Sequence, residues 1–231
     1  MRFAALSTLF LILLATAAFG QTAPPETDFQ IWHETTFVLP VLKAKDDKGE
    51  NFDRLSLLFI GSVRLGQNRL VPVDGRVGAG FDLVLNKHFN VSPTYLYIAA
   101  EPARGRGEWE HRLRFDLTYG HKFKHFSIKD RNRLEYRIRN SRDDSVRYRN
   151  RFTASFPLRR DNKEFFAPFI SAEPYYDFTA GHWSRIDISP GIAKKFTDRL
   201  SSEFFYVWRK NRFGRPRDIH ALGFNLKVKL K

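Results

Sequence analysis

Between residues 107 and 230 the chain alternates with a period of two, with charge on one parity and apolar side chains on the other. Residues 131–139 read Arg-Asn-Arg-Leu-Glu-Tyr-Arg-Ile-Arg, and residues 108–117 read Glu-Trp-Glu-His-Arg-Leu-Arg-Phe-Asp-Leu. Successive side chains of a β-strand point to opposite faces, so each run predicts a strand with one charged and one apolar face. Such strands, repeated along a chain, are typical of transmembrane β-barrels.

The same alternation, interrupted by turn signals, predicts eleven strands and a single all-β, antiparallel transmembrane barrel of about 10–12 strands. The expected strands are 29–43, 54–66, 70–86, 88–101, 107–123, 125–139, 145–158, 164–177, 182–196, 199–212 and 217–230. Bacterial barrels usually have an even number of strands. The run 29–43 therefore either lies in the lumen or beside a ten-stranded barrel, or belongs to a barrel of twelve; its alternation favours twelve.

The cost of charge in lipid predicts which face points inward. A charged side chain facing hydrocarbon costs about 2–4 kcal/mol at mid-depth, so the charged parity must face the lumen. The predicted lumen network consists of Glu110, Arg112, Arg114, Arg131, Arg133, Glu135, Arg137, Arg147, Arg149, Arg151, Glu173, Arg185, Asp187 and Glu203. The predicted lipid-facing residues include Leu134, Tyr136, Ile138, Tyr148, Phe152, Phe156, Phe204, Tyr206, Trp208, Leu222, Phe224, Leu226 and Val228.

This network has two interpretations. Opposite charges on neighbouring strands can pair and fill a narrow lumen as a rigid plug. Alternatively, arginines left without carboxylates form a basic constriction that binds or passes small anions.

The formal charge of +14 also raises the question of whether the protein binds nucleic acid. We expect no nucleic-acid partner, because the arginines alternate with acids on strand faces instead of clustering in tails.

The N-terminal residues predict export. Residues 1–20 have Arg2, an apolar stretch and small residues near Ala18 and Gly20, as a cleavable signal peptide does. Residues 21–28 are expected to form a flexible lead-in, and 29–231 the barrel. The predicted location is the outer membrane of a Gram-negative bacterium, with outer-membrane lipid and the barrel-assembly machinery as partners and the oligomeric state open. The chain has no cysteine, so disulfides are excluded.

Catalytic and metal motifs are missing from the sequence. His121 and His125 have the His-x-x-x-His spacing, but they flank an expected turn. The sequence contains no His-Glu-x-x-His and no Gly-x-Ser-x-Gly, so we expect no metal, no cofactor and no enzymatic activity. Barrel enzymes can use a Ser or His at the rim, and His182 with Ser184 is one pair that could act in this way.

Gly78 and Gly80 lie on an expected strand, where they would leave room in the lumen for neighbouring arginines. Pro93, Pro168, Pro174 and Pro190 fall inside expected strands and predict bulges or strand ends.

Several of these segments resemble one known family. Residues 110–112 (Glu-His-Arg), 131–137 and 147–151 (Arg-Tyr-Arg-Asn-Arg), together with Glu173 and an early Trp32, are similar to the DUF2490 group of bacterial outer-membrane proteins. The resemblance implies an outer-membrane β-barrel and no established activity. Two further alternatives stay open: an outer-membrane enzyme acting on lipid or lipopolysaccharide, and a periplasmic ligand-binding barrel. The outward apolar faces disfavour the periplasmic barrel.

Overall fold

The computed structural model describes residues 26–46, 48–103, 106–160 and 163–230, and every regular element in them is a β-strand. The strands are β1 (Thr27–Lys45), β2 (Asn51–Gly66), β3 (Val71–Val84), β4 (Phe89–Ala103), β5 (Arg106–Lys122), β6 (Ser127–Arg139), β7 (Ser145–Ser155), β8 (Leu158–Arg160), β9 (Lys163–Asp177), β10 (His182–Lys195), β11 (Leu200–Asn211) and β12 (Asp218–Lys229). They match the eleven expected strands closely. The expected signal peptide, 1–20, lies outside the described residues. Among those residues, no helix is long and apolar enough to cross a membrane.

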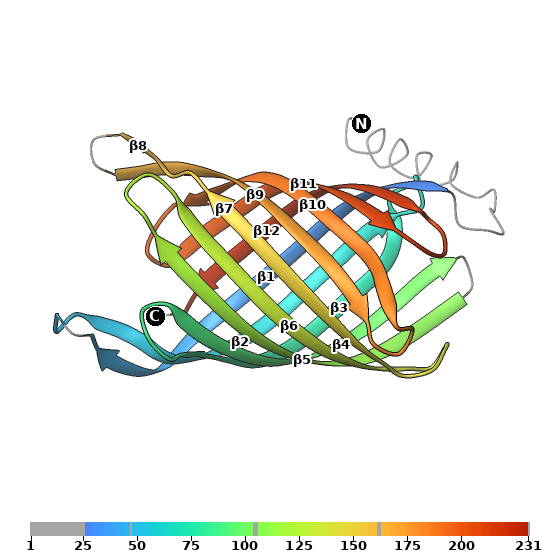
Figure 1. Ribbon diagram of the computed structural model, residues 1–231, viewed down its shortest axis with the longest axis horizontal. Helices are drawn as coiled ribbons and strands as arrows, with labels where there is room; N and C mark the ends of the chain where they lie inside the picture. Colours follow the sequence, from blue (N-terminus) through green and yellow to red (C-terminus); the bar gives the residue numbers. More distant parts are fainter. Residues whose placement is uncertain (1–25, 47, 104–105, 161–162, 231) are drawn as a thin grey trace, which may run out of the picture.

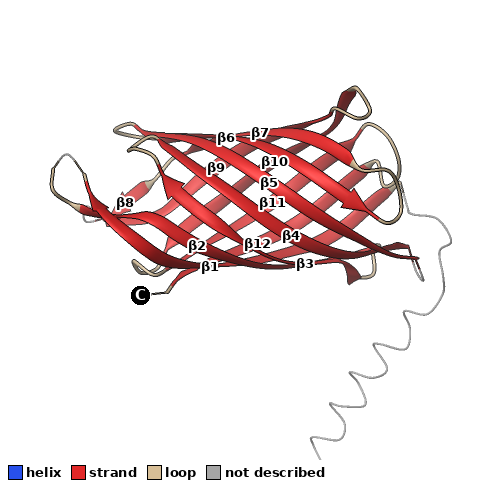
Figure 2. Ribbon diagram, turned by 90° about the horizontal axis from the view of Figure 1, so that it is seen from below, coloured by secondary structure: helices blue, strands red, loops and turns tan. Residues whose placement is uncertain are grey.

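The strands form one closed sheet. Each strand from β1 to β7 pairs antiparallel with the next, β7 pairs with β9, and the ladder continues through β10 and β11 to β12. The pair β12–β1 closes the cylinder and is parallel, with Thr27 opposite Asp218 and Val38 opposite Lys229. The tilted strands and the closed wall are visible in both views (Figures 1 and 2). Closure leaves no free edge, as a membrane-spanning sheet requires.

The short strand β8 is a continuation of β7. Both pair with β9, with Ser155 opposite Phe169 in β7 and Leu158 opposite Phe166 in β8. Phe156 and Pro157 separate them. Counted as one wall strand, β7 and β8 give a barrel of eleven strands over the described residues.

The expectation of an even strand number, and the preference for twelve, are therefore wrong. The run 29–43 lies neither in the lumen nor beside the barrel but in the wall, as β1. Its alternation fits a wall strand, because Trp32 is buried inside while Phe29 and Phe37 are exposed outside. Parallel pairing with β12 satisfies both edges without a further strand.

The two faces of the wall differ as the parity predicts. On β6, Glu135 is 0% exposed and Arg133 7%, whereas Leu134 between them is 48% exposed. On β11, Phe204 is exposed and Phe205 is buried. Exposed aromatic side chains gather toward both ends of the strands, including Trp109, Tyr136, Trp183 and Trp208 at one end and Phe89, Phe123, Phe126 and Phe156 at the other. An apolar wall between aromatic girdles is the exterior of a transmembrane barrel.

One polar cluster interrupts this outer wall. The outward parity of β6 and β7 carries Asp130, Asn132, Tyr148 and Asn150. The Asn150 amide donates to Asp130 at 2.6 Å, and the Tyr148 hydroxyl donates to Asn132 at 2.5 Å. Asn132 donates to Asp130 at 3.1 Å. These mutual hydrogen bonds reduce the cost of placing polar groups against lipid.

The four prolines lie within strands instead of ending them. The pairing of β3 with β4 is interrupted at Pro93, and that of β7 with β9 at Pro174. The pairing of β10 with β11 is interrupted at Pro190. Each of these strands continues past its proline because it still pairs with its other neighbour. Proline removes one ladder donor, so the loss is confined to one side of the strand.

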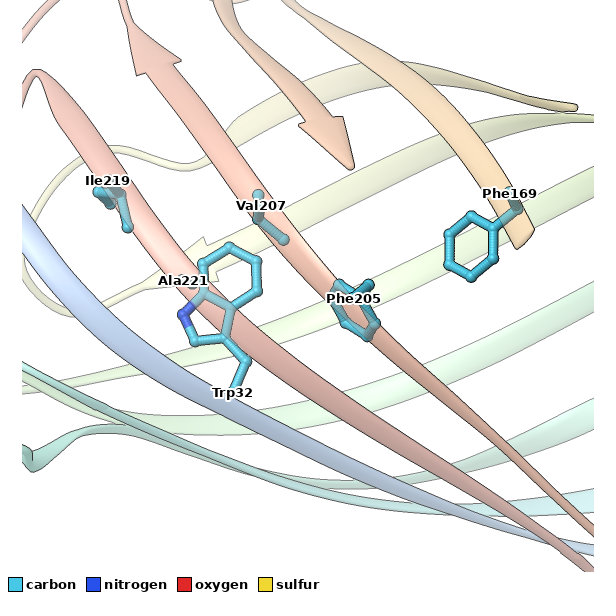
Figure 3. Close-up of a cluster of buried hydrophobic side chains, with 6 residues drawn as sticks. All are labelled: Trp32, Phe169, Phe205, Val207, Ile219 and Ala221. Carbon is cyan, nitrogen blue, oxygen red and sulfur yellow. The ribbon is translucent and has the colours of Figure 1, made fainter. Parts of the chain in front are cut away.

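A group of apolar side chains forms part of the inner wall, and we call it the inner apolar patch. It consists of Trp32, Phe169, Phe205, Val207, Ile219 and Ala221 (Figure 3). The Phe205 ring lies over Gly223, where a Cβ would be 2.3 Å from the ring. At Gly191 a Cβ would be 2.6 Å from both the Phe169 ring and Phe205 Cβ. Glycine at these positions lets the ring lie flat on the wall instead of projecting across the lumen.

Candidate functional site

A cavity of about 870 Å³ occupies the inside of the barrel. Residues at both ends of the strands line it, from Asp28 and Pro216 at one end to Ser127 and Lys227 at the other. Its lining includes fifteen arginines and two lysines against ten carboxylate side chains, a formal excess of seven positive charges. The cavity therefore runs along the barrel axis and is cationic.

The carboxylate of Glu135 on β6 is the centre of a buried ion-pair cluster. It accepts from Arg147 at 2.5 Å and from Arg149 at 2.9 Å. Arg112 and Arg133 approach it at 3.8 and 3.9 Å. These side chains come from β5, β6 and β7, which are adjacent in the wall, so the strand register brings four guanidinium groups to one carboxylate.

Further pairs extend this cluster around the wall. Arg133 donates two hydrogen bonds of 2.6 Å to the Asp116 carboxylate, and Arg209 donates two, of 2.8 and 2.7 Å, to the Asp187 carboxylate. Two-pronged contacts of this kind are among the strongest and most directional that arginine makes. Other pairs include Glu110 with Arg112 and Arg137, Glu173 with Arg131 and Arg149, and Asp74 with Arg76.

Five cavity-lining arginines have no carboxylate within 4.0 Å among the described residues: Arg64, Arg114, Arg139, Arg151 and Arg185. Each has a neutral partner instead, which for Arg139 is the backbone oxygen of Asp143. Arg114 donates to Thr94 at 2.8 Å, Arg151 to Ser171 at 3.2 and 3.1 Å, and Arg185 to Asn211 at 2.7 Å. The Arg64 guanidinium lies 3.8 Å from the centroid of the Trp32 ring. Their positive charges, on β2, β5, β6, β7 and β10, are not neutralised by contact with a carboxylate.

Two buried aromatic rings hold guanidinium groups in the lumen. Tyr175 is 1% exposed, and its hydroxyl donates to Asp187 at 2.7 Å. Arg149 lies 4.4 Å from its ring centroid, and Arg147 and Arg185 each lie 5.3 Å away. Arg209 lies 4.6 Å from the Trp32 ring, which also carries Arg64. Aromatic faces attract cations, so these rings fix arginines without cancelling their charge.

All fourteen residues of the predicted lumen network lie on the inner face, and thirteen of them line the cavity. Glu135 is the exception, since it is fully buried beneath its arginines. The prediction omitted Arg64, Arg76, Asp74, Asp116, Tyr175 and Arg209. Parity pointed to Arg209, which alternates with the outward Trp208. Parity with Glu173 also places Tyr175 on the inner face, but no local signal marked its role, which comes from the arginines that neighbouring strands bring to it.

The other sequence-level candidates do not assemble into a site. Ser184 donates to the backbone oxygen of Tyr175 at 3.3 Å, and His182 stacks on Phe213 at 4.4 Å, so the two make no nucleophile–base pair. Within the described ranges, no three His, Asp or Glu side chains gather as a metal site. The expectation that Gly78 and Gly80 leave room for arginines is wrong. Their nearest side chains are Leu96 and Thr94, which a Cβ would meet at 2.4 Å.

A closed eleven-stranded wall over the described residues, apolar outside and charged inside, defines a transmembrane β-barrel protein. The family model described as "Protein of unknown function (DUF2490)" matches residues 29–220. The chain belongs to this family.

Two solved structures resemble the chain weakly. One is described as "NanC porin structure in rhombohedral crystal form", with a TM-score of 0.46, 9% identity and coverage of 83% of this chain and 92% of that one. The other is "Anion-selective porin from Comamonas acidovorans", with a TM-score of 0.37, 11% identity and coverage of 80% and 59%. Comparison with curated proteins gave no match. Because both TM-scores lie below 0.5, neither resemblance indicates what this barrel does.

Proposed function

We propose that the protein is a narrow outer-membrane pore that binds and passes small anions. The observation that carries this proposal is the set of five cavity-lining arginines that have neutral partners only: Arg64, Arg114, Arg139, Arg151 and Arg185. Rings or rows of arginine and lysine select anions in pores. The outer-membrane location is supported by the apolar outer wall and its aromatic girdles.

The dimensions of the cavity suit small solutes. Spread over a hydrocarbon thickness of about 30 Å, a volume of about 870 Å³ corresponds to a mean cross-section of roughly 30 Å². A passage of this size admits partly dehydrated small anions one behind another. The unneutralised arginines lie on five different strands, and several moderate sites in series allow an ion to enter and to leave.

The paired part of the network has a different task. Glu135, Glu110, Glu173 and Asp187 hold most of the other arginines by short, directional contacts. These pairs keep the wall rigid and prevent long side chains from closing the passage. The same pairs would form a plug if no continuous path remained, and conductance separates the two cases.

The test is electrical. Purified protein in a planar bilayer, under a tenfold KCl gradient, should show discrete current steps and a reversal potential of the sign that chloride selectivity requires. The double variant Arg114→Gln/Arg151→Gln should lower anion selectivity. Arg159→Gln, in the β8–β9 hairpin and outside the cavity lining, should not. Absence of current steps, or cation selectivity of the wild-type protein, would overturn the proposal.

A further inference from the structure

The inner apolar patch faces the same cavity as the arginines. Trp32, Phe169, Phe205, Val207 and Ile219 belong both to the patch and to the cavity lining. Figure 3 shows these side chains spread along the inner side of neighbouring strands. An anion in the lumen therefore meets hydrocarbon surface as well as guanidinium groups.

Unneutralised arginines border this patch on two sides. Arg64 stacks on Trp32 at 3.8 Å. Arg151 donates to Ser171, which is the next inward residue after Phe169 on β9. Neither arginine has a carboxylate within 4.0 Å among the residues that the structure describes. The patch is thus a flat apolar surface with a free positive charge at each of two edges.

A second apolar cluster in the lumen lacks this feature. Ile60, Leu96 and Ile98 form it on β2 and β4. The arginines opposite it in register are Arg76 and Arg112, which are paired with Asp74 at 2.5 Å and with Glu110 at 2.6 Å. This second cluster provides a matched comparison, because it offers apolar surface beside arginines whose charge is already neutralised.

From this arrangement we infer that the lumen prefers organic anions in which a carboxylate is joined to a ring-sized apolar group; the inference rests on the proposed anion pore. A carboxylate can take two parallel hydrogen bonds from one guanidinium. A ring held beside it can cover the Phe205 and Phe169 faces and remove apolar surface from water. Inorganic anions and short carboxylates gain only the first of these interactions.

The experiment compares anions of one charge on the wild-type protein. In a planar bilayer at pH 7, where carboxylic acids are ionised, chloride current is measured while benzoate or acetate is added. Benzoate should reduce the current at a concentration at least about tenfold lower than acetate, equivalent to about 1.4 kcal/mol. Equal block by both anions, with anion selectivity retained, would overturn this inference and leave the proposed pore intact. Absence of anion current would overturn both.

Two substitutions locate the effect. Phe205→Ser should abolish most of the preference for benzoate, whereas Ile60→Ser, in the second cluster, should leave it unchanged. If Phe205→Ser does not fold, Phe205→Leu replaces it in the test, because leucine keeps an apolar side chain but not the flat ring. Phe205→Leu should weaken the preference for benzoate over acetate. Loss of the preference in Ile60→Ser but not in the Phe205 variants would place the binding surface on the other wall and contradict the inference.

Discussion

Replacing Glu135 with Gln tests whether the buried ion pairs hold the barrel together. Glu135 is fully buried and accepts bonds of 2.5 and 2.9 Å from Arg147 and of 2.9 Å from Arg149. Removing one partner of a buried ion pair typically costs about 3–5 kcal/mol, because the other charge stays behind unpaired. The released guanidinium groups border the cavity and can be solvated there, so we expect a loss of about 3 kcal/mol, at the lower end of that range.

The assay is reversible unfolding in detergent or lipid vesicles, followed by tryptophan fluorescence and by the heat-dependent shift in gel mobility. Ser155→Ala is the matched control. Its hydroxyl also lies on the inner face, but its contact with the Pro168 carbonyl is 3.5 Å long, so its removal should cost under about 1 kcal/mol. Glu135→Ala should destabilise at least as much as Glu135→Gln. Equal unfolding free energies for the Glu135 and Ser155 variants would refute the argument that this cluster stabilises the wall.

Three other predictions concern the two faces of the wall. Leu134→Arg should destabilise the protein by about 2–4 kcal/mol in vesicles, since it puts a charge against lipid. Gly223→Val should cost about 1–3 kcal/mol in unfolding experiments by pushing the Phe205 ring off the wall, while Gly61→Val, with open space around it, should be near neutral. In the cysteine-free chain, a lipid-soluble thiol reagent should label Leu134→Cys and spare Arg149→Cys; the opposite pattern would mean that the faces are assigned the wrong way round.

The sequence predicts the wall well because two strong, local signals agree. The period of two indicates strands, and the cost of charge in lipid indicates which parity faces inward. Residues 131–139 show both, and the structure places Leu134 outside and Glu135 inside. The exceptions are informative. Asp130 and Asn132 lie on the outer wall because Tyr148 and Asn150, on the next strand, satisfy them there.

Closure and pairing were beyond the sequence because both depend on register between distant segments. Nothing in 29–43 indicates that its partner is β12, or that the two strands run the same way. Likewise, parity places Arg64 and Arg133 on the inner face alike. Only the register gives Arg133 the carboxylate of Asp116 and leaves Arg64 against a ring. The difference between a neutralised and an unneutralised arginine is therefore a property of the closed barrel.

The parallel closure has a consequence for biogenesis. Since β1 and β12 start level with each other, Thr27 and Lys229 come to lie at opposite mouths of the cylinder. Ten of the eleven strands found in the described residues can enter a bilayer as five hairpins, each returning to the side it left. The remaining strand has to cross without a hairpin partner. The pairing that closes the barrel, between β1 and β12, then joins two strands that run in the same direction. An assembly machine that handles this chain has to carry out one unpaired crossing that an even-numbered barrel never demands.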